Sequence, residues 1–201
     1  MSETTPILHK DDEIIVAVPT KEMFPRYSPQ GFMRTQPFPA LVEKRRGDLE
    51  TDPTYKQLIS YVICRDSRDR VLAYTRLEGG GEDRLHGLTS IGIGGHMNPI
   101  PAVTPELLCS LNAYRELEEE INAKPLVLTP IGFLNDDSNA VGQVHLGIVY
   151  TALVDPDEVH ITETDTLKVE WVSPRQLKDM NLEPWSQILL DQYLRKGVKH
   201  V

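Results

Sequence analysis

Residues 105–122 form the clearest predicted helix of the chain, and this helix carries an unusual concentration of acid. Thr104 suits the N-cap, because its hydroxyl can accept a hydrogen bond from the first turn. Pro105 suits the first helical position, and Glu106 is favourable near the positive end of the helix dipole. The helix needs a surface to pack on, which the apolar segments around it provide.

A helical wheel at about 100° per residue divides this helix into two faces. The predicted buried face holds Leu107, Leu111, Tyr114 and Ile121. The opposite face holds Asn112, Glu116, Glu119 and Glu120. Because Glu116 lies three and four positions before the other two glutamates, the three carboxylates are neighbours. Glu118 falls on the predicted buried side, where the wheel offers no explanation for it.

The acidic cluster is locally unfavourable. Each like-charge pair costs about 0.2–0.5 kcal/mol, and anions near a helix C-terminus oppose the dipole. Arg115 relieves part of this by pairing with Glu119 one turn on. A divalent cation is the simplest further relief, and an all-oxygen ligand set favours Mg²⁺ or Mn²⁺. The alternative is a solvated acidic face without a ligand, since glutamate is a good helix former.

The segments around the helix predict an α/β protein. Apolar runs at 57–64 and 71–76 predict a hairpin, and further strands are predicted at 14–18, 88–95, 126–134, 143–153 and 169–172. Residues 135–142 are expected to be a loop. Helical segments are predicted after Pro174 and from Glu183 to about Arg195. This order suggests an α/β sandwich around a mixed sheet.

Residues 1–54 are predicted to be an N-terminal extension packed on a main domain of residues 55–201. Six prolines between 19 and 53 oppose long regular elements, so one strand and otherwise irregular chain are expected, with a short helix possible at 38–46.

Composition excludes several classes. The 21 Lys and Arg stand against 30 Asp and Glu, a formal net charge of −9, which disfavours non-specific binding of nucleic acid or anionic membrane. Cys64 and Cys109 form no disulfide framework or metal motif. No transmembrane run and no signal peptide are recognised, so a cytoplasmic location is expected.

Gly94-Gly95-His96 at a strand end, followed by Arg115-Glu116-Leu117-Glu118-Glu119-Glu120 on a helix, resembles the motif of the Nudix hydrolase family. That motif runs glycine, five residues, glutamate, seven residues, then Arg-Glu-hydrophobic-x-Glu-Glu-x-Gly-hydrophobic. The run from Arg84 to Asn98, with its RLHG and IGIGGH segments, resembles one subgroup. So does the VHLG segment at 144–147. The resemblance covers about residues 55–175.

The chain departs from the motif in three places. Gly95 lies 20 positions before Arg115, so the intervening loop is six residues longer than in the family pattern. The first motif glutamate would fall at Leu107, with Glu106 adjacent but out of register. The late glycine is Asn122, a mild change because asparagine tolerates the left-handed conformation of a helix C-cap.

The resemblance implies a Nudix α/β/α sandwich whose catalytic helix lies at about 105–122, and hydrolysis of a diphosphate linked to another moiety. It implies that Glu116, Glu119, Glu120 and the carbonyl of Gly95 hold Mg²⁺ or Mn²⁺, and that Arg115 orients the glutamates. Glu116 is one candidate for the general base. Family members also use a loop base, which leaves Asp136, Asp137 and Glu163 open. Arg76, Arg84 and His96 are candidate substrate contacts, although solvent exposure or turn capping would equally account for them.

The expected partner is a small phosphorylated molecule, with no nucleic-acid polymer and no membrane. A homodimer is expected only because members of the resembled family form dimers. The rival hypothesis is a catalytically weak Nudix-like domain that senses a nucleotide or sugar phosphate, which the missing first glutamate favours and the three retained glutamates oppose. A third hypothesis is a protein-interaction domain that uses the extension.

Overall fold

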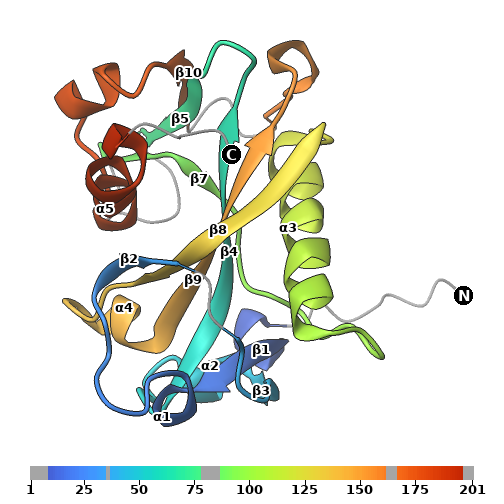
Figure 1. The fold of residues 1–201 in the computed structure, drawn as a ribbon. Coiled ribbons are helices and arrows are strands. Elements are labelled where there is room, and N and C mark those ends of the chain that lie inside the picture. The colour runs from blue at the N-terminus through green and yellow to red at the C-terminus, as the bar shows by residue number, and fades with distance from the viewer. Residues whose placement is uncertain (1–8, 35–36, 78–86, 162–166, 197–201) are drawn as a thin grey trace, which may run out of the picture.

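A computed structural model describes residues 9–34, 37–77, 87–161 and 167–196, and in these residues the strands join into one mixed sheet (Figure 1). Its main path runs β10-β5-β4-β9-β8-β2, with β1 and β7 pairing with β4, β3 with β1, and β6 with β5. The strands are β1 (Ile14–Pro19), β2 (Gly31–Met33), β3 (Val42–Arg45), β4 (Tyr55–Arg65), β5 (Val71–Arg76), β6 (Thr89–Ser90), β7 (Gly92–Ile93), β8 (Val127–Asn135), β9 (His145–Leu153) and β10 (Leu167–Val172).

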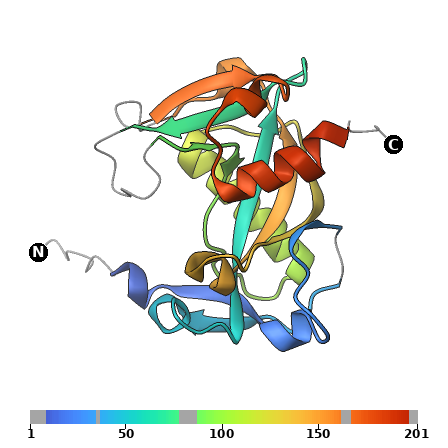
Figure 2. The ribbon, with the colours of Figure 1, turned by 90° about the vertical axis from the view of Figure 1, so that its left-hand side faces the viewer.

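The helices cover both faces of this sheet. The α-helices are α1 (Thr20–Met23), α2 (Arg46–Leu49), α3 (Pro105–Ile121), α4 (Ala140–Val144) and α5 (Pro184–Gln192). Short 3₁₀ turns are η1 (Lys10–Asp12), η3 (Pro156–Glu158), η4 (Gln176–Asp179) and η5 (Leu194–Lys196). Helix α3 lies on one face and α5 on the other, with α5 in front of the sheet in Figure 2. The predicted α/β/α sandwich with a mixed sheet is confirmed.

Strand β4 is the centre of the fold because it is apolar on both faces. Leu58 and Val62 belong to the core cluster that includes α3, whereas Tyr61 and Ile63 belong to the cluster that includes α5. This alternation follows from the two-residue period of a strand. Along its edges β4 pairs in parallel with β9 from Gln57 to Arg65, and antiparallel with β1 and β7.

The predicted buried face of α3 is wrong for three of its four residues, and only Ile121 is buried as predicted. Leu107, Leu111 and Tyr114 are 48%, 39% and 45% exposed. The residues that face the core are instead Leu108, Cys109, Ala113, Leu117 and Ile121. Four of them repeat every fourth residue, and the small Cys109 and Ala113 let the helix lie close to the sheet. The exposed Glu118 shares the solvent face with Tyr114, which accounts for a charge on the side that the wheel predicts to be buried.

The N-terminal extension is more regular than predicted. It contains β1, β2 and β3 rather than one strand, and the helix proposed for 38–46 is replaced by β3 followed by α2. Pro19 is the last residue of β1, and the other described prolines of this segment lie between the elements rather than inside them. Because β1 pairs with β4 and β2 with β8, the extension joins the main sheet through backbone hydrogen bonds.

Two other boundaries differ from expectation. The strand predicted at 88–95 is divided into β6 and β7, which pair with different strands, β5 and β4. The loop predicted at 135–142 continues into α4, whose N-cap Asn139 accepts a hydrogen bond from Gly142 N. Across the described ranges, no helix has the length and apolarity that a membrane span requires.

The turn between β4 and β5 is held by one buried carboxylate. Asp66 accepts hydrogen bonds from the backbone N–H groups of Arg68 and Arg70 at 2.9 and 2.8 Å, and from the Arg70 guanidinium at 2.7 Å. Burial alone would raise the pKa of Asp66, but these donors outweigh it and hold the pKa below its ordinary value of 3.8. The anionic form is therefore part of the folded hairpin.

We expect Asp66→Asn to lower the free energy of unfolding by about 1–2 kcal/mol at pH 7. The pKa of Asp66 is lower in the folded state than in the unfolded state. The carboxylate therefore stabilises the fold fully when the pH is above the unfolded-state pKa. This stabilisation is lost as the pH falls through the folded-state pKa. Urea unfolding of the wild type and of Asp66→Asn between pH 7 and pH 3 measures the difference in their free energies of unfolding. We expect this difference to shrink below about pH 4. A difference that stays constant over this pH range contradicts the role given to the Asp66 carboxylate. Asp69→Asn, at an exposed position of the same turn, is the control.

Candidate active site

The segment after β7 turns sharply against β4. Ser60 N donates to Gly95 O at 2.9 Å, and Met97 N donates to Leu58 O at 3.0 Å, so the segment continues antiparallel to β4 beyond the strand. Gly94 has a φ of 151°, and a Cβ there would lie 1.9 Å from Ser60 O. Only glycine permits both the conformation and this close approach. Gly94 is therefore required by the path of the backbone.

Arg115 ties this glycine turn to the acidic face of α3. Its Nη2 donates to Glu116 Oε1 at 2.6 Å and to the carbonyl oxygen of His96 at 2.9 Å. Its Nη1 donates to Glu119 Oε2 at 2.8 Å. The planar guanidinium has enough donors for all three acceptors. One side chain thus holds two of the predicted metal ligands in register with the turn.

A pair of asparagines makes a second tie between the same two elements. Asn98 N donates to Asn112 Oδ1 at 2.9 Å, and Asn112 Nδ2 returns a hydrogen bond to Asn98 O at 3.0 Å. Asn112 is 1% exposed, so these bonds satisfy a buried amide. They explain why a polar residue lies within the helix face that packs on the core.

Glu116 is a carboxylate held where charge is costly. It is 5% exposed, and a Cβ at Gly95 would lie 2.9 Å from its Oε2. Burial, strengthened by the nearby Glu119 and Glu120, raises the pKa of Glu116 to about 7 despite the opposing Arg115. The absence of a side chain at Gly95 therefore lets the carboxylate pack directly against the turn, and further positive charge would stabilise it there.

The donor set fits a hard divalent cation. Carboxylate oxygens of the three glutamates and a backbone carbonyl are the ligand types that Mg²⁺ and Mn²⁺ prefer. Among the residues that the structure describes, no three His, Cys, Asp or Glu side chains already converge into a metal-binding group. Arg115 occupies one oxygen each of Glu116 and Glu119, and the second oxygens remain as donors.

The position of the first motif glutamate lies away from this cluster. Leu107, which occupies it, and the adjacent Glu106 are both exposed in the first turn of α3, about two turns before Arg115. Neither side chain therefore takes the place of the motif residue against the glycine turn.

His96 belongs to a buried polar group that the sequence did not reveal. Its Nε2 lies 2.8 Å from Gln57 Oε1 and 3.2 Å from His145 Nε2. His145 Nδ1 lies 2.7 Å from the carbonyl oxygen of Val141, so Nδ1 carries the proton and Nε2 accepts. His96 must then donate from Nε2, which leaves its Nδ1 as an acceptor.

Burial keeps both histidines neutral. It lowers the pKa of His96 to about 3 and also lowers the pKa of His145. As a predicted substrate contact, His96 therefore offers a neutral acceptor rather than a positive charge for a phosphate. The Gln57 amide Nε2 is buried and has no hydrogen-bond partner among the residues that the structure describes. Gln57 and His145 are opposite residues on β4 and β9, a pairing that only the sheet register reveals.

Asp137, one of the predicted loop bases, is fully engaged by neighbours. Its Oδ1 pairs with Lys56, which is 1% exposed, and its Oδ2 accepts from Ser28 and Gln30 at 2.7 Å each. Burial raises the pKa of Asp137, but the Lys56 ammonium and these donors outweigh it, so the net pKa is lowered. A carboxylate with a depressed pKa and occupied oxygens is better suited to anchoring the extension than to accepting a proton.

The remaining predicted residues are placed as follows. Asp136 is buried, and its Oδ1 accepts from Ser138 N at 3.1 Å. Arg76 lies over the ring of Tyr74, 5.4 Å from its centroid. Arg84 and Glu163 lie outside the described residues, as does most of the loop at 79–87.

The chain resembles known proteins in both sequence and structure. No family model matches the chain. In sequence it is 38% identical over 203 residues to Protein YmaB of Bacillus subtilis (strain 168), and the match covers 90% of this chain and 98% of YmaB.

Solved structures extend the likeness. The crystal structure of Tm1382, a candidate Nudix hydrolase, matches with a TM-score of 0.76 and 28% identity over 92% of this chain and 100% of Tm1382. The NUDIX domain of Shewanella oneidensis NrtR, cocrystallised with ADP ribose, matches with a TM-score of 0.52 and 19% identity. That match covers 70% of this chain and 88% of NrtR, and it concerns the fold alone.

Proposed function

We propose that this chain, a member of the Nudix hydrolase family by its likeness to Tm1382, hydrolyses a diphosphate linkage in a small phosphorylated substrate with the help of a divalent cation. The substrate class is a nucleoside diphosphate linked to another moiety. The observation that carries the proposal is the buried Glu116, held beside the Gly95 turn by the same guanidinium that holds Glu119.

Each residue of the site has a part in this proposal. Glu116, Glu119, Glu120 and the Gly95 carbonyl would hold Mg²⁺ or Mn²⁺. When bound, such an ion polarises a phosphoryl oxygen and lowers the pKa of a coordinated water. Arg115 keeps the glutamates aligned with the turn. Glu116, buried beside the turn, is the carboxylate that we assign to accept a proton from the attacking water.

Two observations support the proposed substrate class: the charge chemistry of the site and the ligand of a structurally similar domain. An acidic chain can hold a polyanion only where cations gather, and a glutamate cluster with divalent ions provides such a place. ADP ribose, which the NrtR domain holds, is itself a nucleoside diphosphate linked to a sugar.

The proposed location is the cytoplasm. Cys64 and Cys109 are both free and buried, which suits a reducing compartment.

The decisive experiment incubates a panel of nucleoside diphosphates, each linked to a sugar or another moiety, with Mg²⁺, with Mn²⁺ and with EDTA, and separates the products by chromatography. Hydrolysis of the diphosphate gives a nucleoside monophosphate and the phosphorylated second moiety. We expect at least one compound to give both products with metal, and product formation to fall to background in EDTA. Product formation that is unaffected by EDTA would contradict metal dependence. No product from any compound, together with a ligand-induced rise in Tm, would replace the enzyme by the sensor hypothesis.

A further inference from the structure

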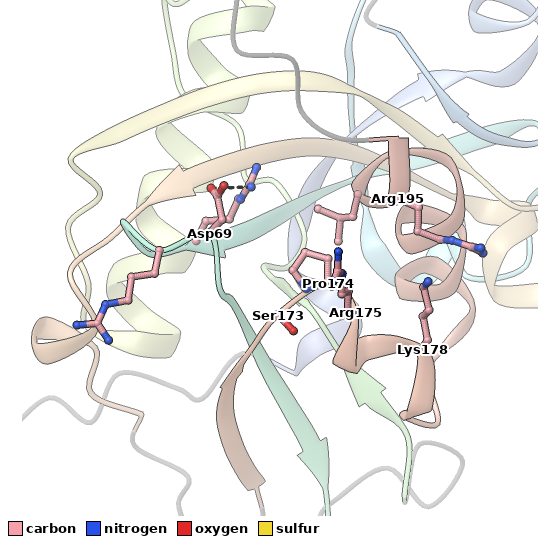
Figure 3. Close-up of a pocket in the computed structure, with 9 residues that line it drawn as sticks. Asp69, Ser173, Pro174, Arg175, Lys178 and Arg195 are labelled. Atoms are coloured by element: carbon pink, nitrogen blue, oxygen red, sulfur yellow. Dashed lines mark hydrogen bonds and ion pairs between the residues drawn. The ribbon is translucent and has the colours of Figure 1, made fainter.

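A second polar feature lies on the opposite face of the sheet from α3. It is a pocket of about 760 Å³ at the end of β4, closed by the segment after β10 and by the turn after α5 (Figure 3). Arg65 contributes from the same strand face as Tyr61 and Ile63, which pack toward α5. We call this feature the basic pocket.

The lining of the basic pocket is strongly cationic. Its charged members are Arg65, Arg68, Asp69, Arg175, Lys178 and Arg195. Five cations against one carboxylate give a formal charge of +4, in a chain whose net charge is −9. This local excess of positive charge is opposite in sign to the net charge of the chain. It therefore indicates a specific role for this part of the surface.

Internal ion pairs neutralise only part of this charge. Arg65 pairs with Asp69 at 2.8 Å, and Arg195 pairs with Asp191 of α5 at 2.8 Å. No described residue forms an ion pair with the side chains of Arg68, Arg175 or Lys178. Figure 3 shows Asp69 on one side of the basic pocket, with Lys178 and Arg195 on the other.

A buried donor in the lining also lacks a partner among the described residues. Arg65 Nε is covered from solvent and makes no hydrogen bond to any described residue, although the side chain is held by its Nη2 bond to Asp69. An unsatisfied N–H on a cation is costly to bury, and negative charge in the adjacent pocket would lower that cost without a direct contact to the covered atom. This observation is independent of the count of charges.

The chemistry of the lining selects the class of ligand. Guanidinium groups bind phosphate through paired hydrogen bonds, and lysine adds a point charge. The described residues that line the basic pocket include no Phe, Tyr, Trp or His, so a nucleobase finds no ring to stack on. The volume lies in the range of small-molecule sites, and single-stranded nucleic acids usually need aromatic platforms.

We propose that the basic pocket binds a compact anion carrying two or more phosphate groups, of which inorganic pyrophosphate is the simplest. A single phosphate would leave part of the charge of the three unpaired cations, Arg68, Arg175 and Lys178, unmet. The proposal does not depend on catalysis at α3, because binding here requires neither turnover nor a divalent cation.

Calorimetric titration with sodium pyrophosphate in EDTA tests this proposal. EDTA removes the divalent ions on which anion binding at the glutamate cluster relies, so only the basic pocket should respond. We expect saturable binding by the wild type and about a tenfold or greater rise in Kd for the double variant Arg175→Gln, Lys178→Gln. Both side chains are exposed, so the fold should persist, as an unchanged Tm would verify.

A matched double variant provides the control. Lys21→Gln, Arg26→Gln removes the same charge from exposed positions in and just after α1, at the other end of β4 (Figure 1). It should keep the Kd of the wild type. Equal weakening by both doubles would show a general charge effect and overturn the site. The site is also overturned if the wild type shows no saturable binding at millimolar pyrophosphate, or if a single-stranded oligonucleotide binds more tightly than pyrophosphate.

Discussion

Replacing Glu119 by glutamine should lower kcat for diphosphate hydrolysis by about a hundredfold or more while leaving the protein folded. The loss follows because glutamine keeps the shape of the side chain but removes an anionic ligand from the proposed cation site. Glu119 is exposed and its ion pair is with Arg115 on the same helix, so the free energy of unfolding should change by no more than about 0.5 kcal/mol. Steady-state kinetics with saturating Mg²⁺ and urea unfolding measure the two quantities.

Glu118→Gln is the matched control for this prediction. It makes the same chemical change one position earlier, on the solvent face that α3 shares with Tyr114. Its kcat should stay close to that of the wild type. If Glu119→Gln retains the wild-type rate, or if both variants lose activity equally, the assignment of Glu119 to the cation site is wrong.

Asp137→Ala should lower the free energy of unfolding by about 3 kcal/mol. The change leaves the Lys56 ammonium, which is 1% exposed, without its anionic partner, and a lone buried charge is strongly destabilising. Burial lowers the pKa of Lys56, and its hydrogen bond to the Asp137 carboxylate opposes that shift. We take the lower end of the usual range because the Asp137 side chain is 29% exposed. Urea unfolding at pH 7 measures the effect.

Two further variants separate the causes. Asp157→Ala removes an exposed carboxylate on η3 and should change stability by less than about 0.5 kcal/mol. The double variant Lys56→Met, Asp137→Leu removes both charges and should recover most of the loss. A stable Asp137→Ala protein that has lost kcat would instead make Asp137 a catalytic base and contradict the anchoring role.

The predicted helix boundaries were accurate because their signals are local. Thr104 Oγ accepts from Leu107 N at 3.3 Å, and Asn122 adopts the left-handed conformation with a φ of 49°. The strand predicted at 71–76 matches β5 for the same reason, since the polar turn before it is closed by its own Asp66. These interactions join residues within a few positions of one another.

The contacts that sequence reasoning missed join distant segments. Lys56 meets Asp137, and His96 meets Gln57 and His145, through pairings of β4 with neighbouring strands. The orientation of α3 was missed because leucines occur on both of its sides, and local periodicity does not reveal which side the sheet covers. The three strands of the extension depend likewise on β4, β8 and β1 as partners.

The sequence by itself determined that three glutamates and Arg115 are neighbours on one helix, because helical spacing is a local property of the backbone. It also determined that glycines lie where the turn demands them. Only the tertiary structure decided that Glu116 is buried against Gly95, that its pKa lies near 7, and that five cations gather behind the sheet. Burial and electrostatic environment are decided by which distant segments pack together.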